Sequence, residues 1–223
     1  MKNPLLLALA TVFVATSSLF PAGAFEGQYD MNFKGPDMDI STTFWVKGGH
    51  IKMRHHGQME KMGEIIIRDD MSTMIVAMPQ QMAYLEMPIP TEGDFSLPPP
   101  NTEGEIPFKK TDQSKEILGH KAHLFILEMG KEKTEIWATD ELGSMPFARN
   151  QIFNNWAAAM RQVSGLPNFF PLETVGYKSG KEQFKMTVTR IEKMELPDTT
   201  FDPPAGYRKM SLPAGMGGFM NKK

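Results

Sequence analysis

The fold class is decided by residues 181–207, which read KEQFKMTVTRIEKMELPDTTFDPPAGY. Apolar and polar side chains alternate in the first part of this stretch, where the apolar positions are Phe184, Met186 and Val188. A period of two is typical of a β-strand with one buried face and one solvent-exposed face. Prolines and a glycine follow, and these residues end strands and form turns. We therefore predict a strand over 181–191 that closes a sheet, with Phe201 and Tyr207 packed at the open end of that sheet.

Similar short segments recur along the chain and are separated by turn residues, which is the pattern of a largely antiparallel sheet. The predicted strands cover residues 25–33, 39–47, 50–56, 64–68, 72–78, 82–87, 109–112, 121–129, 131–139, 171–178 and 181–191. Both faces of the segment 121–129 are apolar, so each face is either covered or lines a cavity. We predict one mainly β domain over residues 25–210, built as a curled antiparallel sheet or half-open barrel.

Three segments depart from this pattern. Residues 88–107 are rich in proline and are interpreted as a long surface loop, because a domain linker at this point would leave both halves with unpaired sheet edges. Apolar residues recur at steps of three and four over residues 146–163, which predicts one helix that packs against the sheet. The tail at 211–223 is rich in glycine, methionine and lysine, and we expect it to be flexible.

The first 24 residues have the features of a secretory signal peptide. Lys2 provides a basic start, an apolar run covers residues 5–14, and Ala22-Gly23-Ala24 is a small-residue cleavage site. The apolar run is too short to span a bilayer comfortably, and no later stretch is long and apolar enough to do so. We therefore expect cleavage near Ala24, a periplasmic or secreted location, and a mature protein that is not integral to the membrane.

Composition excludes several classes of function. The 223 residues contain no cysteine, so disulfides, thiolate metal sites, cysteine nucleophiles and a lipid anchor on a cysteine are all excluded. The formal net charge is −2, so bulk electrostatics do not favour nucleic acid or an anionic membrane surface as a partner. About 200 residues remain after cleavage, which is enough for one domain with a substantial core.

Short motifs at predicted strand ends and turns carry a family resemblance. They are Phe25-x-Gly27, Trp45-x-Lys47-Gly48, Lys52-Met53-Arg54, Ile66-x-Arg68-Asp69, Met78-Pro79 with Tyr84, Gly119-His120-Lys121-Ala122, and Leu196-Pro197-Asp198 with Phe201, Pro204 and Gly206-Tyr207. In these motifs the chain resembles an uncharacterised family of exported bacterial proteins related to the LolA and LppX type of lipoprotein and lipid carriers. The resemblance covers nearly all of the mature chain. It implies a half-open barrel curled around one or more helices, with an apolar cavity between them, and relatives often have a cysteine where Ala122 stands.

A carrier of a lipid, acyl chain or lipoprotein needs no reactive group, because burial of apolar surface contributes about 25 cal/mol per Å². Large apolar side chains of the predicted sheet and helix are the candidate cavity lining. They are Phe44, Trp45, Tyr84, Phe125 and Trp137 from the sheet, and Phe153, Trp156 and Met160 from the helix. The alternative is that these side chains simply pack against one another as core. Abundant methionine favours a carrier, since a flexible thioether adapts to irregular ligands.

Methionine and histidine also support a hypothesis of a different class, a periplasmic copper-binding protein. The candidate ligands crowd one stretch and are His50, Met53, His55, His56, Met59 and Met62. Thioether and imidazole groups suit copper(I). On a strand, however, Met53 and His55 share one face while His50 and His56 share the other, so only two or three of them could converge. Compositional drift, or surface thioethers that protect against oxidation, would also explain the methionine content.

No signature of a known catalytic site is present. The chain lacks a Gly-x-Ser-x-Gly elbow, a His-Glu-x-x-His pair, a P-loop and a dinucleotide fingerprint. Adjacent Asp69 and Asp70 at a predicted turn point apart and do not form a carboxylate pair. We therefore expect a protein that is not an enzyme and that needs no cofactor, with copper as the alternative. A third hypothesis is an envelope scaffold that binds a protein partner through the loop at 88–107.

Overall fold

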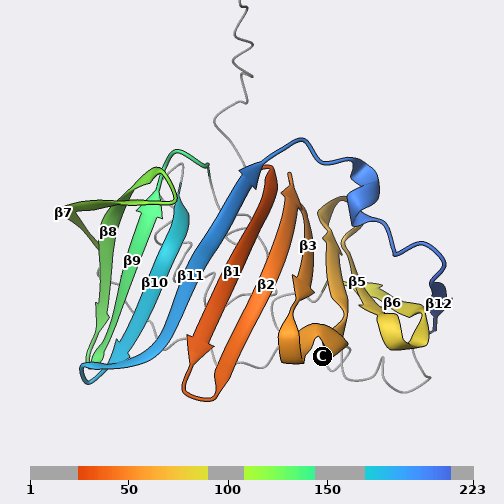
Figure 1. The fold of residues 1–223 in the computed structure, drawn as a ribbon, viewed down its shortest axis with the longest axis horizontal. Helices are drawn as coiled ribbons and strands as arrows, with labels where there is room; N and C mark the ends of the chain where they lie inside the picture. The colour runs from red at the N-terminus through yellow and green to blue at the C-terminus, as the bar shows by residue number, and fades with distance from the viewer. Residues whose placement is uncertain (1–24, 90–107, 144–168, 212–223) are drawn as a thin grey trace, which may run out of the picture.

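A computed structural model, shown in Figure 1, describes residues 25–89, 108–143 and 169–211. Several sequence predictions lie outside these residues: the signal peptide, the helix at 146–163, most of the loop at 88–107 and most of the tail. Among the described residues, no helix has the length and apolar character needed to cross a membrane.

Most of the described residues form one large β-sheet. Its strands are β1 (Gly27–Gly35), β2 (Met38–Lys47), β3 (His50–His55), β4 (Glu64–Arg68), β5 (Thr73–Met78), β6 (Ala83–Pro88), β7 (Phe108–Ile117), β8 (His120–Met129), β9 (Glu132–Thr139), β10 (Phe170–Lys178), β11 (Lys181–Lys193) and β12 (Arg208–Met210). Short 3₁₀ turns are η1 (Gly57–Met62), η2 (Asp69–Met71), η3 (Pro79–Gln81) and η6 (Asp198–Phe201). The strand order is β12-β6-β5-β4-β3-β2-β1-β11-β10-β9-β8-β7 (Figure 1).

The sheet is curled and does not close on itself. Its described edges are β7, which pairs with β8, and β12, which pairs with β6. Neighbouring strands are antiparallel except for the short parallel pair of β12 and β6. The predicted fold class, a mainly β protein with a curled and half-open antiparallel sheet, is therefore confirmed.

The prediction that residues 181–191 close the sheet is wrong. β11 lies inside the sheet, between β1 and β10, and its pairing with β1 joins the first six strands to the next four (Figure 1). The alternating pattern correctly indicates one buried and one exposed face, but it carries no information about position within a sheet. Pairing between β1 and β11 shifts register beside Met31, which is a β-bulge of the kind that bends a strand.

The segment that follows β11 crosses one face of the sheet, and does not plug an open end as predicted. Phe201 is 1% exposed and belongs to a cluster with Ile66, Ile75 and Leu196. Polar contacts fix the segment there: Lys47 donates to the carbonyl oxygen of Leu196 at 2.6 Å and lies 2.8 Å from Asp198. Tyr207 is half-buried, and its backbone N–H donates to the carbonyl of Pro204 at 3.2 Å.

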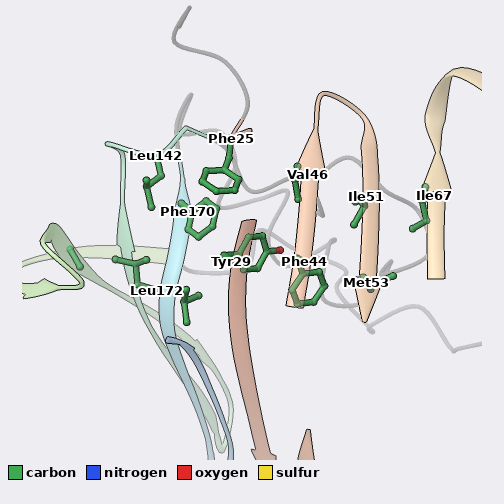
Figure 2. Close-up of a cluster of buried hydrophobic side chains, with 12 residues drawn as sticks. Phe25, Tyr29, Phe44, Val46, Ile51, Met53, Ile67, Leu142, Phe170 and Leu172 are labelled. Atoms are coloured by element: carbon green, nitrogen blue, oxygen red, sulfur yellow. The ribbon is translucent and has the colours of Figure 1, made fainter. Parts of the chain in front are cut away.

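The main core lies on the opposite face. Its buried members come from strands on both sides of the β1–β11 pair, from that pair itself, and from Phe25 and Leu142 just outside the strands. They are Phe25, Tyr29, Phe44, Val46, Ile51, Met53, Ile67, Ala122, Leu142, Phe170, Leu172 and Val188. Figure 2 shows ten of these side chains directed into a common interior. Burial of each large side chain contributes about 1.5–3 kcal/mol, so this interior is the chief source of stability in the described part of the chain.

Candidate functional site

Two parallel rows of apolar side chains cross the sheet on the face that carries the main core. Residues opposite one another on neighbouring strands share a face, so the register defines the rows directly. The first row runs Tyr29, Phe44, Met53, Ile65, Val76 and Leu85, from β1 to β6. The second row runs Val46, Ile51, Ile67, Met74 and Met87, from β2 to β6. We call these eleven residues the apolar rows.

Burial falls along both rows toward the β6 side of the sheet. In the first row Tyr29, Phe44 and Met53 are 0–5% exposed, whereas its last three members are only half-buried. In the second row Met74 and Met87 are likewise half-buried, while the first three members are buried. The outer half of the apolar rows is therefore a contiguous apolar surface with incomplete cover, which is a common mark of a binding surface.

The opposite face of the same strands is covered more completely. Ile66, Ile75 and Ala77 alternate with members of the apolar rows and are 0–2% exposed. The segment around Phe201 packs over this second face. Strands β4 and β5 thus bury fully the apolar residues on the face that packs against the Phe201 segment. On the face that carries the apolar rows, some of their residues are only half-buried.

The chemistry of the apolar rows is almost purely hydrocarbon and thioether. They contain no charged side chain, and their single polar atom is the hydroxyl oxygen of Tyr29. His55 lies on the same face two residues beyond Met53, and its Nδ1 is 2.8 Å from the hydroxyl of Thr42. Burial lowers the pKa of His55, and the neighbouring His56 lowers it further. His55 is therefore neutral at neutral pH and adds no charge to this face.

The residues predicted to line a cavity are divided between different surroundings. Phe44 belongs to the apolar rows and stacks on Tyr29 with ring centroids 4.8 Å apart. Trp45, its neighbour in β2, necessarily points to the opposite face, where Lys52 and Arg54 lie 5.6 and 5.2 Å from its ring. Tyr84 is half-buried and packs against the cluster that contains Phe201.

The other predicted lining residues are not members of the apolar rows. Phe125 is buried and makes an edge-to-face contact with Phe169, with centroids 5.2 Å apart. Trp137 is half-buried and packs against the main core, and the Nζ atom of Lys115 lies 4.3 Å from the centre of its ring. Phe153, Trp156 and Met160 fall outside the residues that the structure describes.

Sequence reasoning missed Tyr29 and the half-buried ends of the rows. Segment 64–68 reads EIIIR and is apolar on both faces, so the pattern alone did not show which face belongs to the core. The signal that could have found the rows is the register, because the short turns between β2, β3, β4, β5 and β6 fix which residues lie opposite one another.

The candidate copper ligands do not form one group. Met53 is buried in the apolar rows, whereas His50 faces the other way, with its ring 5.5 Å from that of Phe201. His56 lies 2.8 Å from the hydroxyl of Thr43. Met59 and Met62 belong to η1, where Met59 is half-buried and Met62 is 53% exposed. Within the described ranges, no three histidine, cysteine or carboxylate residues are placed to hold a metal ion.

A charged group lies on the face opposite the apolar rows. Glu64 is 8% exposed, accepts a hydrogen bond from Arg54 Nε at 2.6 Å and lies 3.0 Å from Lys52 Nζ. Burial alone would raise the pKa of Glu64, but the hydrogen bonds from Lys52 and Arg54 outweigh it and hold the pKa below its ordinary value. A carboxylate held ionised in this way stabilises the sheet and is unsuited to act as a general acid.

The comparisons assign the chain to a family. Residues 25–207 match the family described as "Domain of unknown function (DUF4412)", and the chain belongs to this family. The match is to this family and not to the LolA or LppX type of carrier, so a relation to those carriers stays a prediction. No curated protein matches the sequence.

Two solved structures are distant likenesses of this chain. One is PNGF-II, with 11% identity and a TM-score of 0.42, covering 88% of this chain and 33% of that one. Another is MucB, with 10% identity and a TM-score of 0.45, covering 83% of this chain and 60% of that one. The chain thus spans less than two thirds of either protein. Both TM-scores lie below 0.5, so neither likeness identifies a function for this chain.

Proposed function

We propose that this protein is an exported, non-catalytic carrier that binds a hydrophobic ligand of the bacterial envelope along the apolar rows. The ligand class is a lipid, an acyl chain or the lipid part of a lipoprotein. The observation that carries the proposal is the gradient of burial, in which Ile65, Val76, Leu85, Met74 and Met87 form a continuous apolar surface with incomplete cover.

Binding to this surface needs no chemistry beyond desolvation. Each buried methylene group of a ligand contributes about 0.8 kcal/mol, so a long chain gains enough to outweigh the cost of ordering it. Met74 and Met87 sit at the half-buried end of the second row. Their unbranched thioether side chains adapt to ligands of different shape, which suits a carrier that must both load and release.

The signal-peptide features of the first 24 residues support an envelope location, where such ligands occur. The copper hypothesis gains no support from the described residues, because its candidate ligands lie on two faces of β3 and in η1. The scaffold hypothesis depends on the loop at 88–107, most of which lies outside the described residues. We therefore put forward the carrier function alone.

Native mass spectrometry and lipid extraction of protein purified from a bacterial envelope test the proposal. The wild-type protein should carry bound lipid, and the double variant Val76→Gln and Leu85→Gln should lose most of it. The matched control replaces two exposed methionines of the same meander, Met71→Gln and Met82→Gln, and should keep its lipid. Circular dichroism and thermal unfolding establish that both variants fold. A wild-type protein without lipid, or equal loss in both double variants, would overturn the proposal.

A further inference from the structure

The hydroxyl group of Tyr29 is buried and makes no hydrogen bond to the part of the chain that the structure describes. The side chain is 0% exposed, and its hydroxyl oxygen has no partner among the described residues. Buried hydroxyl groups almost always have a partner, because leaving one unpaired costs free energy. An unpaired phenol in the middle of an apolar interior is therefore a feature that needs an explanation.

Aromatic contacts hold the Tyr29 ring in one orientation. The ring stacks on Phe44 and makes edge-to-face contacts with Phe25 and Phe170, at centroid distances of 4.8, 5.8 and 5.4 Å. Figure 2 shows the hydroxyl oxygen directed away from Phe170 and toward the strands that carry Val46 and Ile51. The hydroxyl thus lies at the buried β1 end of the apolar rows and points along the rows toward β2 and β3.

We propose that Tyr29 is the polar anchor of the binding surface, and that its hydroxyl donates a hydrogen bond to the carbonyl oxygen of a long-chain acyl ester lying along the apolar rows. This inference rests on the proposed carrier function and deepens it, since it names the chemical class of the ligand. The acyl chain covers the half-buried residues, and its ester group reaches the buried end.

The donor role follows from the surroundings of the phenol. Burial raises the pKa of Tyr29 well above its ordinary value, so the group keeps its proton and remains able to donate. A ligand carbonyl is the simplest acceptor that an otherwise apolar molecule can offer to it. Met53 lies between Tyr29 and the half-buried Ile65 along the first row, and its flexible side chain can adopt other rotamers as a ligand enters.

An ester is favoured over a free fatty acid on grounds of charge. No aspartate, glutamate, lysine or arginine belongs to the apolar rows, so no cation there would pair with a carboxylate. A buried carboxylate without a cation is strongly disfavoured. His55, on the same face, stays neutral at neutral pH because burial and His56 lower its pKa.

The length of the apolar rows indicates the length of acyl chain that the surface can hold. Tyr29 and Leu85 lie five strand steps apart in the register, so they are separated by about 24 Å measured along the curled sheet. This span suits a long-chain acyl group and leaves a short one in contact with only part of the rows.

Three probes with the same long saturated chain test the inference: methyl palmitate, palmitic acid and hexadecane. Their affinities are measured by displacement of the fluorescent dye anilinonaphthalene sulfonate from wild-type protein, from Tyr29→Phe and from the control Tyr84→Phe, whose half-buried ring packs against the second cluster. Wild-type protein should bind methyl palmitate more tightly than either other probe. Tyr29→Phe should weaken methyl palmitate binding by about three- to tenfold, the effect of one lost hydrogen bond, and leave hexadecane unchanged.

A second measurement does not depend on any variant. The infrared carbonyl stretch of bound methyl palmitate should move to lower frequency than in hydrocarbon solvent, and the shift should disappear in Tyr29→Phe. A wild-type protein that binds none of the probes would overturn the carrier function and the anchor together. Binding of all probes without an ester preference, an ester preference that survives in Tyr29→Phe, or tighter binding of palmitic acid would overturn the anchor alone.

Discussion

Lys115 on the edge strand β7 lies 2.8 Å from Glu173 on β10, although β8 and β9 separate these two strands in the sheet. The contact requires strong curling at this end of the sheet, because flat neighbouring strands would place the two backbones too far apart for the side chains to meet. Lys185 of β11 lies 3.0 Å from the other carboxylate oxygen of Glu173. The Glu173 carboxylate thus forms ion pairs with two lysines whose strands lie on opposite sides of β10 in the sheet.

Replacing Lys115 with methionine should lower the free energy of unfolding by about 0.5–1 kcal/mol. Methionine keeps the apolar part of the side chain over Trp137 but removes the charge, and solvent screening at this partly exposed site limits the effect. Urea denaturation measures the change. The control Lys178→Met removes an ion pair of 3.2 Å whose side chains are 62% and 60% exposed, and it should have no measurable effect. An equal change in the free energy of unfolding for the two variants would show that the ion pair of Lys115 does not stabilise the curled sheet.

Stability should fall in acid partly because of Glu64. Its pKa is below the ordinary value in the folded protein, since hydrogen bonds from Lys52 and Arg54 outweigh the opposing effect of burial. Its stabilising contribution is therefore fully present at pH values above the ordinary pKa of a glutamate carboxyl group. The contribution is lost as the pH falls through the lower pKa that Glu64 has in the folded protein. Urea denaturation from about pH 7 down to about pH 3 should follow this loss.

The variant Glu64→Gln isolates that contribution. It should be less stable than wild type by about 2 kcal/mol at neutral pH, because two cations lose their partner in a poorly hydrated site. The difference should shrink toward zero in acid, where Glu64 of the wild type is also uncharged. The control Asp39→Asn removes an exposed pair with Lys34 and should change stability by less than about 0.5 kcal/mol throughout. A difference in stability between wild type and Glu64→Gln that stays constant at every pH would show that the charge of Glu64 does not stabilise the fold.

Gly63, between η1 and β4, should not tolerate a side chain. Its φ is 80°, and a Cβ atom there would lie 1.8 Å from the carbonyl oxygen of Ala77. Gly63→Ala should therefore reduce the free energy of unfolding by about 2 kcal/mol or more. Gly57→Ala is the matched control, because Gly57 also has a positive φ of 65° but faces open space. It should cost only about 1 kcal/mol, and equal thermal shifts for the two variants would exclude the steric explanation.

Without ligand, Tyr29→Phe should stabilise the protein. The substitution removes an unpaired buried hydroxyl and keeps the aromatic packing, so the free energy of unfolding should rise by about 1 kcal/mol. Delipidated protein is compared by thermal unfolding with wild type and with Tyr84→Phe, which should differ little from wild type. A loss of stability in Tyr29→Phe would mean that the hydroxyl has a partner within the protein.

Local sequence patterns predicted the strands well. Alternation and turn residues identified most of the long strands, because both are properties of a few neighbouring residues. The strand predicted at 109–112 is an exception, since β7 extends to Ile117 through a polar segment without alternation. The interior position of β11 was not predictable in this way, since its pairing with β1 joins distant parts of the chain. The strand β12 has only three residues and therefore carries no periodic signal.

The candidate site was less accessible from sequence. Phe44 and Trp45 were assigned to one cavity because both are large and aromatic, yet adjacent residues of a strand point to opposite faces. The apolar rows depend on the register of five strand pairs across β1 to β6. The difference in burial between the two faces depends on which face the segment around Phe201 covers, and that contact joins distant parts of the sequence. Nothing in the sequence distinguishes a buried tyrosine whose hydroxyl has a partner from one such as Tyr29.

Methionine side chains provide the most direct test of the central claim, that a hydrophobic ligand binds along the outer half of the apolar rows. Isotope-labelled methionine methyl groups are observed by NMR while methyl palmitate is added to delipidated protein. The account predicts that the signals of Met74 and Met87, at the half-buried end of the second row, shift first and most, while those of the exposed Met38, Met71 and Met82 stay in place. Shifts confined to the exposed methionines, or no shifts in Met74 and Met87 at saturation, would contradict it.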